Sequence, residues 1–417
     1  MSESAYSAPG AGVGLSRSDF EPTLRFPAIR AFFKALSSPP SRANAADCVP
    51  HFYGIDFLRG VAATVVLVWH YQHFFYTRPL APGQAPPEID RHIEPLYSLL
   101  HPLYNHGYWA VQLFWIISGF VFAHVYAGRA PAATDYAASR VARLFPLNAV
   151  TLVAITVFQA ASWRLLHGFQ VVPTNDAYHF FLSLFLIPHW GFQDAISFNA
   201  PVWSVSVEIG IYILFYFVAR HVFSLGLIVP VVLAGFGYTI VQKGTPMWYF
   251  GMCLHFFFVG CAVYFVLIKF RQYRAALLSI CIASISYFAY LVAKRQIEPF
   301  TNTEGYLFVP MVLMVGMLDF RPKFAEAMRR VRWLGDATYS IYMWHFPIQV
   351  LILTVLGVIG RGYGIFQSPL TLVAWIAGML VLSHYSFIYI EKPAQRWVRT
   401  FFRTVPDWRG ADAPRAT

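Results

Sequence analysis

The sequence predicts an all-α polytopic membrane protein with about ten transmembrane helices and both termini in the cytoplasm. Of the 417 residues, 57% are hydrophobic and only 12% are charged, whereas a soluble protein averages about 25% charged residues. Apolar segments of the length that crosses a bilayer recur along the chain. The basic residues gather between these segments on alternate sides, which is the positive-inside pattern of membrane proteins.

Residues 1–50 are rich in Ser, Pro, Gly and Ala and show little periodicity, so we expect a mostly disordered cytoplasmic arm. No apolar segment precedes a small-residue cleavage site, and we therefore expect no signal peptide. Within the arm, residues 24–36 mix basic and aromatic side chains at roughly helical spacing. This segment could lie on an anionic membrane surface or pack on the first loop, and the sequence favours neither.

Ten apolar segments follow the arm, and the eighth is short for a membrane span. They cover approximately residues 55–75, 107–127, 144–165, 202–219, 223–241, 248–268, 275–293, 306–319, 338–359 and 370–390. Together they form one predicted domain over residues 51–395, followed by a cytoplasmic tail over residues 396–417. The apolar segment from Tyr178 to Pro188 is too short to cross a bilayer, so we expect a re-entrant or interfacial helix there.

The distribution of basic residues supports ten spans. With the N-terminus inside, 24 of the 31 Lys and Arg residues fall on the inner side and 7 on the outer side. Counting the segment at 178–190 as an eleventh span would place the basic run from Arg321 to Arg332 outside, against the positive-inside rule. The net charge of +11 therefore reflects topology, and we expect no nucleic-acid partner.

The four cysteines indicate neither a metal site nor a disulfide framework. Three of them, Cys253, Cys261 and Cys281, lie in apolar segments, and Cys48 lies in the polar arm. No pair has the spacing of metal ligands. We therefore expect no bound metal.

The first span contains the strongest candidate functional residue. His70 follows Arg59 by eleven positions, which places it about 16 Å deeper along a helix. If Arg59 marks the membrane surface, His70 lies near the middle of an apolar core about 30 Å thick. An ionisable residue at that depth is a functional candidate, although a histidine bonded to a neighbouring helix would be equally compatible with this segment alone.

The fourth span brings a carboxylate to a similar depth. Glu208 lies about 9 Å below the outer end of this span and shares a helix face with Ser204. A carboxylate and an imidazole at one depth could form a general-base pair in which Glu208 orients His70 and stabilises its imidazolium. The alternative is a structural hydrogen bond between two helices, and the sequence does not show whether the helices touch.

Arg140 and Arg143 follow the second span in a segment that we interpret as a cytoplasmic loop. Their i, i+3 spacing would let two guanidinium groups bind phosphates. Arginines of inner loops also serve as topological anchors, so the pair alone is weak evidence. Gly119 in the second span allows close approach of another helix, and we expect a packing role. His345 lies about 10 Å into the ninth span.

Six motifs, taken in order, resemble the membrane-bound acyltransferase type 3 family. They are Asp56-Phe57-Leu58-Arg59-Gly60 with His70, which fits an Arg-X10-His pattern; Phe114-Trp115-Ile116-Ile117-Ser118-Gly119-Phe120; Arg140-x-x-Arg143; Trp203-Ser204-x-x-x-Glu208; Tyr339-Ser340-x-Tyr342 with His345; and Glu391-Lys392-Pro393. Any one motif is weak, but six in order within a ten-span frame are specific. The resemblance covers roughly residues 52 to 400.

This resemblance implies an O-acyltransferase in the bacterial inner (plasma) membrane that uses acetyl-CoA, or another acyl-CoA, as co-substrate and binds no cofactor. The expected acceptor is a hydroxyl of a cell-surface or exported glycan, or of a lipid-linked saccharide; some relatives acylate macrolides. The family pattern implies that His70 is catalytic, and we expect Glu208 to act with it. Expected donor- or substrate-binding residues are Arg59, Arg140, Arg143, Trp203, Ser204 and His345. The short tail predicts a stand-alone form without an added hydrolase-like domain.

Other functional classes fit the sequence less well. A proton-coupled transporter would also place His and Glu inside the membrane, but transporters typically contain internal repeats, and none is visible here. A lipid-sensing or scaffolding protein would leave the ionisable residues unexplained. The sequence leaves open the acceptor, the acyl group (acetyl, succinyl or longer), direct or covalent transfer, and the oligomeric state.

Overall fold

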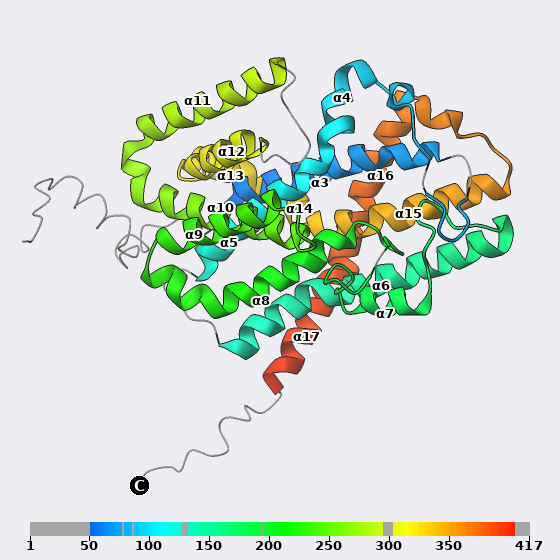
Figure 1. The fold of residues 1–417 in the computed structure, drawn as a ribbon, viewed down its shortest axis with the longest axis horizontal. Coiled ribbons are helices and arrows are strands. Elements are labelled where there is room, and N and C mark those ends of the chain that lie inside the picture. The colour runs from blue at the N-terminus through cyan, green and yellow to red at the C-terminus, as the bar shows by residue number, and fades with distance from the viewer. Residues whose placement is uncertain are drawn as a thin grey trace, which may run out of the picture.

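The structure is a computed structural model that describes residues 51–76, 79–85, 87–126, 132–193, 195–294 and 303–404. Over these residues the chain forms a bundle of α-helices joined by turns (Figure 1), and no strand is longer than an isolated bridge. The predicted arm, including the segment at 24–36, lies outside the described residues. The fold class is therefore all-α, as the sequence predicts.

Ten helices of the described chain coincide with the ten apolar segments predicted as spans. They are α3 (Tyr53–His70), α5 (Ala110–Tyr126), α6 (Ala133–Leu166), α8 (Val202–Ser224), α9 (Ile228–Gln242), α10 (Trp248–Phe270), α11 (Arg274–Ala293), α12 (Gly305–Leu318), α15 (Thr338–Val358) and α16 (Pro369–Ser386). The short apolar segment between α6 and α8 forms α7 (Ala177–Leu184). Eight residues span about 12 Å as a helix, which is too short to cross a bilayer.

The remaining helices lie between or after these ten. They are α4 (Tyr97–His106), α13 (Pro322–Arg330), α14 (Arg332–Asp336) and α17 (Lys392–Thr404), the last joined to α16 by a π-helical turn (Phe387–Glu391). The predicted tail thus begins inside a helix.

Six stretches of the described chain are long and apolar enough to cross a membrane. They are Tyr97–Tyr126, Ala133–Leu166, Val202–Ala219, Trp248–Ala293, Thr338–Val358 and Pro369–Phe402. The fourth stretch comprises both α10 and α11, while α9 and α12 are shorter apolar helices. The protein is therefore a multi-pass membrane protein by composition, and the count of ten crossings and the side of each terminus remain predictions.

The start of α3 is fixed by a residue from the end of α12. The Asp319 carboxylate accepts hydrogen bonds from the backbone N–H of Gly54 at 2.8 Å and of Ile55 at 3.4 Å. These N–H groups have no partner within their own helix, and a carboxylate also suits the positive end of the helix dipole. The N-terminus of α3 and the C-terminus of α12 therefore meet at one end of the bundle, which we call the arginine end because Arg140 and Arg143 also lie there.

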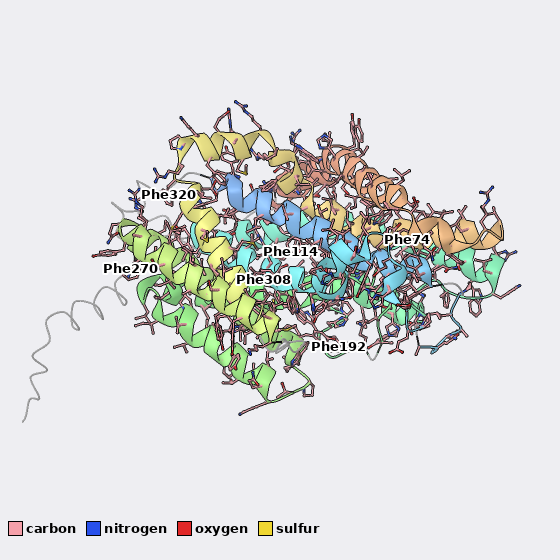
Figure 2. The ribbon with its side chains drawn as sticks, turned by 90° about the horizontal axis from the view of Figure 1, so that it is seen from above. Phe74, Phe114, Phe192, Phe270, Phe308 and Phe320 are labelled. Atoms are coloured by element: carbon pink, nitrogen blue, oxygen red, sulfur yellow. The ribbon has the colours of Figure 1, made fainter. Side chains whose placement is uncertain are left out.

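The opposite end of the bundle, which we call the loop end, collects the connections that follow α3, α6 and α15. The Tyr71 hydroxyl donates to the backbone carbonyl of Phe366 at 3.0 Å, and Leu80 pairs with Phe169. Figure 2 shows Phe270 and Phe320 toward one end of the bundle and Phe74 toward the other. Loops that the sequence places on the same side of the membrane are thus grouped together in space.

Close packing of α5 on α10 depends on glycine. A Cβ atom at Gly119 would lie 1.7 Å from the Phe257 carbonyl oxygen, and one at Gly260 would lie 1.9 Å from the Ile116 carbonyl oxygen. No side chain fits at such distances, because the obstacle is backbone. The predicted packing role of Gly119 is confirmed.

The helix α6 begins earlier than expected, and this changes the setting of two arginines. It starts at Ala133, whereas the apolar segment begins near residue 144, so Arg140 and Arg143 lie on a helix and not in a loop. The added residues mix charged and hydroxyl side chains with alanines, which are good helix formers, and they place Asp135 in the first turn, where a negative charge is favourable. Hydropathy alone does not detect such an extension.

Candidate active site

A cavity of about 490 Å³ opens at the arginine end between α3, α5, α6, α8 and α15. Its size lies within the range of about 300–1,000 Å³ that is usual for small-molecule sites. The polar or charged residues that line it are His51, Asp56, Arg59, Ser118, Arg140, Arg143, Ser204, Glu208, Tyr212, Asp336, Thr338, Tyr339, Tyr342 and Arg399. Five predicted site residues are therefore brought together here, namely Arg59, Arg140, Arg143, Ser204 and Glu208.

The arginines of the cavity differ in how they are held. Arg143 lies 3.6 Å from the carboxylate of Glu391, which is only 1% exposed. Arg59 lies 3.6 Å from Asp56, one turn earlier on α3. Arg140 forms no ion pair within the described residues; its guanidinium lies over the Phe122 ring at 4.7 Å from the ring centroid. Arg140 is thus oriented by aromatic contact and keeps its charge available to a ligand.

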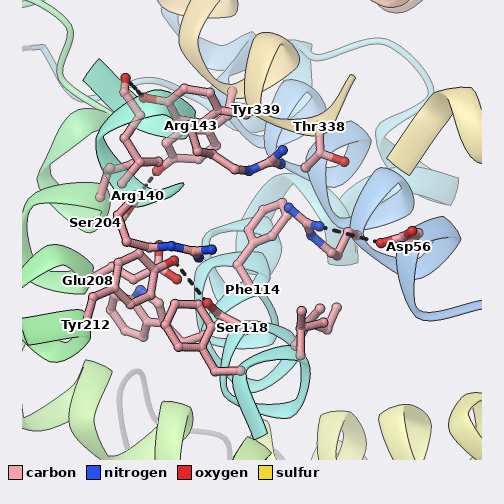
Figure 3. Close-up of a pocket in the computed structure, with 18 of the residues that line it drawn as sticks. Asp56, Phe114, Ser118, Arg140, Arg143, Ser204, Glu208, Tyr212, Thr338 and Tyr339 are labelled. Atoms are coloured by element: carbon pink, nitrogen blue, oxygen red, sulfur yellow. Dashed lines mark hydrogen bonds and ion pairs between the residues drawn. The ribbon is translucent and has the colours of Figure 1, made fainter. Parts of the chain in front are cut away.

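Glu208 faces the same cavity from α8. Its carboxylate adjoins the hydroxyls of Ser118 and Tyr212, which are 3.1 Å apart. Figure 3 shows Arg140, Glu208, Ser118 and Tyr212 grouped on one side of the cavity, with Arg143 above them. The cavity therefore places a carboxylate among arginines.

Ser204 closes another part of the cavity wall through a bond to Tyr342 of α15. The Ser204 and Tyr342 hydroxyls are 2.6 Å apart, and the backbone carbonyl of Pro201 lies within hydrogen-bond distance of both, at 3.3 Å from Ser204 and 2.8 Å from Tyr342. The neighbouring Trp203 does not line the cavity, and its expected binding role stays a prediction. It packs among aromatic rings, including Trp115 at 5.9 Å and Tyr249 at 5.0 Å, because adjacent residues of a helix point in different directions.

His70 lies outside the cavity lining, in a cluster of three buried histidines. Its ring is 4.6 Å from that of His345 on α15 and 5.2 Å from that of His73, which follows α3 in a short 3-10 turn. The Nδ1 atom of His70 lies 3.0 Å from the Val66 carbonyl oxygen. A carbonyl only accepts, so Nδ1 carries the proton, and Nε2 of the neutral ring carries the lone pair.

One aromatic contact joins the cavity to this cluster. The Tyr342 ring lines the cavity and lies 5.8 Å from the ring of His345, which in turn contacts His70. The predicted histidine His345 is therefore the residue between the two parts of the site. Its buried Nε2 atom has no hydrogen-bond partner among the described residues.

The structure does not pair Glu208 with His70. The orienting contact expected from Glu208 comes instead from the Val66 carbonyl, one turn earlier on α3, and Glu208 belongs to the cavity. The sequence predicts how deep His70 and Glu208 lie in the membrane, but not how far apart they are in the membrane plane. Two residues at one depth can therefore belong to different parts of the site. The catalytic roles of the two residues remain predictions.

The sequence analysis missed one histidine of the cluster and the glutamine that contacts it. His73 lies three residues after His70, and Gln349 lies four residues after His345 on α15. Their i, i+3 and i, i+4 spacings within apolar sequence were the available signal. Despite three histidines, no group of three or more metal-ligating side chains in the described chain is arranged as a metal site.

Comparisons with known proteins agree with the sequence motifs. YrhL of Bacillus subtilis (strain 168), provisionally named a peptidoglycan O-acetyltransferase, is 25% identical over 365 residues, which is 72% of this chain and 52% of YrhL. The peptidoglycan O-acetyltransferase OatA of Listeria monocytogenes is 21% identical over 341 residues, which is 70% of this chain and 51% of OatA. The chain thus spans about half the length of these relatives. No solved structure matches it.

The family comparison covers nearly the whole helical bundle. The model of the acyltransferase 3 family, described as an acyltransferase domain, matches residues 52–388. This range includes the cavity-lining residues from Asp56 to Tyr342 and all three histidines of the cluster. The protein therefore belongs to the acyltransferase 3 family and contains its acyltransferase domain.

Proposed function

We propose that the protein is an integral-membrane O-acyltransferase that moves an acyl group, most simply acetyl, from cytoplasmic acyl-CoA to a hydroxyl of a cell-envelope glycan. The observation that carries this proposal is the junction of an arginine-lined cavity with a buried histidine cluster through Tyr342 and His345. A phosphate-bearing donor suits the first part and proton transfer suits the second. No resident cofactor is needed, because acyl-CoA is a substrate.

The donor site in this proposal is the cavity. Coenzyme A carries phosphates at one end and a thioester at the other. Arg59, Arg140 and Arg143 contribute three guanidinium groups to one chamber, and guanidinium is well matched to phosphate by charge and by bidentate hydrogen bonding. The thioester arm would then lie toward Tyr342, and Glu208 would offset part of the positive charge and order Arg140.

The acyl-transfer step is assigned to His70. Its Nδ1–H is held by the Val66 carbonyl, so Nε2 is the basic atom. In direct transfer, Nε2 takes the proton of the acceptor hydroxyl while that oxygen attacks the thioester carbonyl; the thiolate of coenzyme A leaves and receives the proton from the imidazolium. In covalent transfer, Nε2 attacks the thioester carbonyl and the thiolate of coenzyme A leaves. The acceptor oxygen then attacks the acyl-imidazolium, His70 is released as the neutral imidazole, and the hydroxyl proton neutralises the thiolate.

The proposed orientation places the arginine end in the cytoplasm of a bacterial cell and the loop end outside, in the inner membrane. It rests on the excess of Lys and Arg residues on the predicted inner side, 24 against 7. Acyl-CoA is made in the cytoplasm, whereas envelope glycans lie outside. The histidine cluster would lie between the two substrates.

Peptidoglycan is the first acceptor to test, because both relatives are named as peptidoglycan O-acetyltransferases. Peptidoglycan from a strain lacking this protein should have less O-acetylation than that of the parent, as measured by mass spectrometry of muropeptides, and re-expression should restore it. If peptidoglycan is unchanged but another envelope glycan or a lipid-linked saccharide loses its acetyl group, that molecule is the acceptor. An unchanged acylation profile in all of these fractions would contradict the proposal.

A further inference from the structure

Gln349 lies at the centre of the histidine cluster, yet no catalytic motif includes it. It is fully buried on α15, one turn beyond His345. Its Nε2 atom lies 2.7 Å from the backbone carbonyl oxygen of His70, and its Oε1 atom lies 3.4 Å from Nδ1 of His73. One amide group therefore contacts the two histidines that α3 and the following turn contribute.

The direction of both hydrogen bonds follows from chemistry. The carbonyl of His70 only accepts, so the Nε2 group of Gln349 donates to it. The amide oxygen must then face His73 and accepts from its Nδ1–H. His70 is also protonated at Nδ1, and His345 has its Nδ1 atom 3.2 Å from the Ile341 carbonyl oxygen, which requires the same tautomer. All three neutral rings therefore keep the lone pair on Nε2.

The contact falls where the chain changes conformation. The α-helix α3 ends at His70, and the residues from Tyr71 to Phe75 form a 3-10 turn. The two geometries direct side chains differently, so a small change at the junction would turn the His70 ring. Val66 holds the ring and Gln349 holds the backbone carbonyl, which together leave His70 little freedom.

We propose that Gln349 is a positioning residue of the transfer reaction: it fixes His70 through its backbone and sets the orientation of His73, so that Nε2 of His70 meets the reacting atoms. This inference rests on the proposed catalytic role of His70. Gln349 itself touches neither the donor cavity nor its arginines. Loss of Gln349 should therefore lower turnover without weakening donor binding.

The test uses the full-length protein in lipid nanodiscs with labelled acetyl-CoA and the acceptor found for the wild type. Gln349→Met keeps the side-chain length and removes both hydrogen bonds. Gln349→Leu also removes both hydrogen bonds, with a different side-chain shape, and it provides a second variant if the first folds poorly. For each variant, kcat, KM for acetyl-CoA, coenzyme A affinity and thermal midpoint are measured on the folded fraction.

A matched control is available at Gln159. It is 1% exposed, and its side chain also makes two hydrogen bonds, in this case both to backbone: it donates to the Gln170 carbonyl at 2.8 Å and accepts from the Gln170 N–H at 2.9 Å. These bonds hold the connection after α6 and involve none of the three histidines. Gln159→Met should lower the thermal midpoint while its folded fraction keeps the wild-type kcat.

The expected result is a fall in kcat on the order of 10²-fold for both Gln349 variants, the usual effect of displacing a reacting group by about 1 Å, with unchanged coenzyme A affinity. Wild-type kcat in folded Gln349→Met or Gln349→Leu would overturn the inference, as would an equal loss of kcat in Gln159→Met. His70→Ala is measured beside them. Full activity of that variant would refute the proposed function itself, whereas an inactive His70→Ala with active Gln349 variants would refute the positioning role alone.

Discussion

Replacing Arg140 and Arg143 separately by alanine should distinguish a donor site from a pair of topological anchors. Both side chains line the cavity, but they differ in their other partners. Arg140 lies over Phe122 without an ion pair among the described residues, whereas Arg143 contacts the buried carboxylate of Glu391. Arg140→Ala should therefore change mainly ligand affinity, and Arg143→Ala should change both affinity and stability.

The size of each effect follows from these contacts. A hydrogen bond to a charged group contributes about 1.5–3 kcal/mol, which corresponds to a roughly 10- to 150-fold rise in the Kd for coenzyme A. In Arg143→Ala, Glu391 would keep only the hydrogen bonds from Ser340 at 2.9 Å and Gln395 at 3.0 Å. A buried charged group that loses a partner costs about 1–3 kcal/mol of folding free energy, so this variant should also melt at a lower temperature.

Calorimetric titration of coenzyme A and thermal unfolding, on the same preparations, measure the two quantities. Arg91 offers a matched control at the loop end, because it bonds the buried Glu94 carboxylate at 2.9 Å and lies outside the cavity. Arg91→Ala should lower the thermal midpoint without changing coenzyme A affinity. Unchanged affinity in both Arg140→Ala and Arg143→Ala would refute the reasoning and leave these arginines as anchors of the membrane topology.

Topology, the cavity carboxylate and a buried glutamate each give a separate test. In a protein without native cysteines, a cysteine at Gln84 should react with an impermeant thiol reagent from outside and one at Ala327 from inside; equal access to both would contradict ten crossings. Glu208→Gln keeps the shape but removes the charge beside Arg140, and acetyl transfer per folded molecule should fall on the order of 10²-fold; full activity would exclude a role for the charge. Burial raises the pKa of the Glu304 carboxyl group to about 7, so the folded state binds a proton at this group more tightly than the unfolded state does. The free energy of unfolding should therefore decrease by about 3 kcal/mol as pH rises from 4.5 to 7. Thermal midpoints of Glu304→Gln should lack this decrease, and an identical pH dependence in both proteins would assign it to other groups.

The helices were largely predictable from the sequence, because the cost of placing polar backbone and charged side chains in lipid imposes long apolar segments. All ten predicted segments coincide with helices, and the short segment near α7 was correctly separated from them. The start of one helix was predicted wrongly, because a segment can form a helix without being apolar. The first eleven residues of α6 mix alanine with charged and hydroxyl side chains, so their hydropathy is too low for a span, and Arg140 and Arg143 were assigned to a loop.

The site was only partly predictable, because hydropathy gives depth along one axis alone. Arg59, Arg140, Arg143 and Ser204, which were expected to bind donor or substrate, line one cavity, whereas Glu208 lies with them and not beside His70 as expected. Trp203 does not join them, since it points from another face of α8.

The histidine cluster required knowledge of which helices are neighbours. His70 and His345 are 275 positions apart in the chain, and only the packing of α15 against α3 brings their rings to 4.6 Å. Glu208 has a predicted depth similar to that of His70, but its side chain faces the cavity and not the histidine cluster. Packing between distant helices is set by the shapes of many side chains, which periodicity does not reveal.

The central claim is that His70 carries out acyl transfer from a donor held in the arginine-lined cavity, and its most direct test is the transfer of labelled acetyl per folded molecule of His70→Ala. The account predicts that this variant folds, binds coenzyme A with wild-type affinity and transfers no label above background, because the cavity is intact and only the basic nitrogen is missing. Substantial specific activity in a well-folded His70→Ala protein would contradict it.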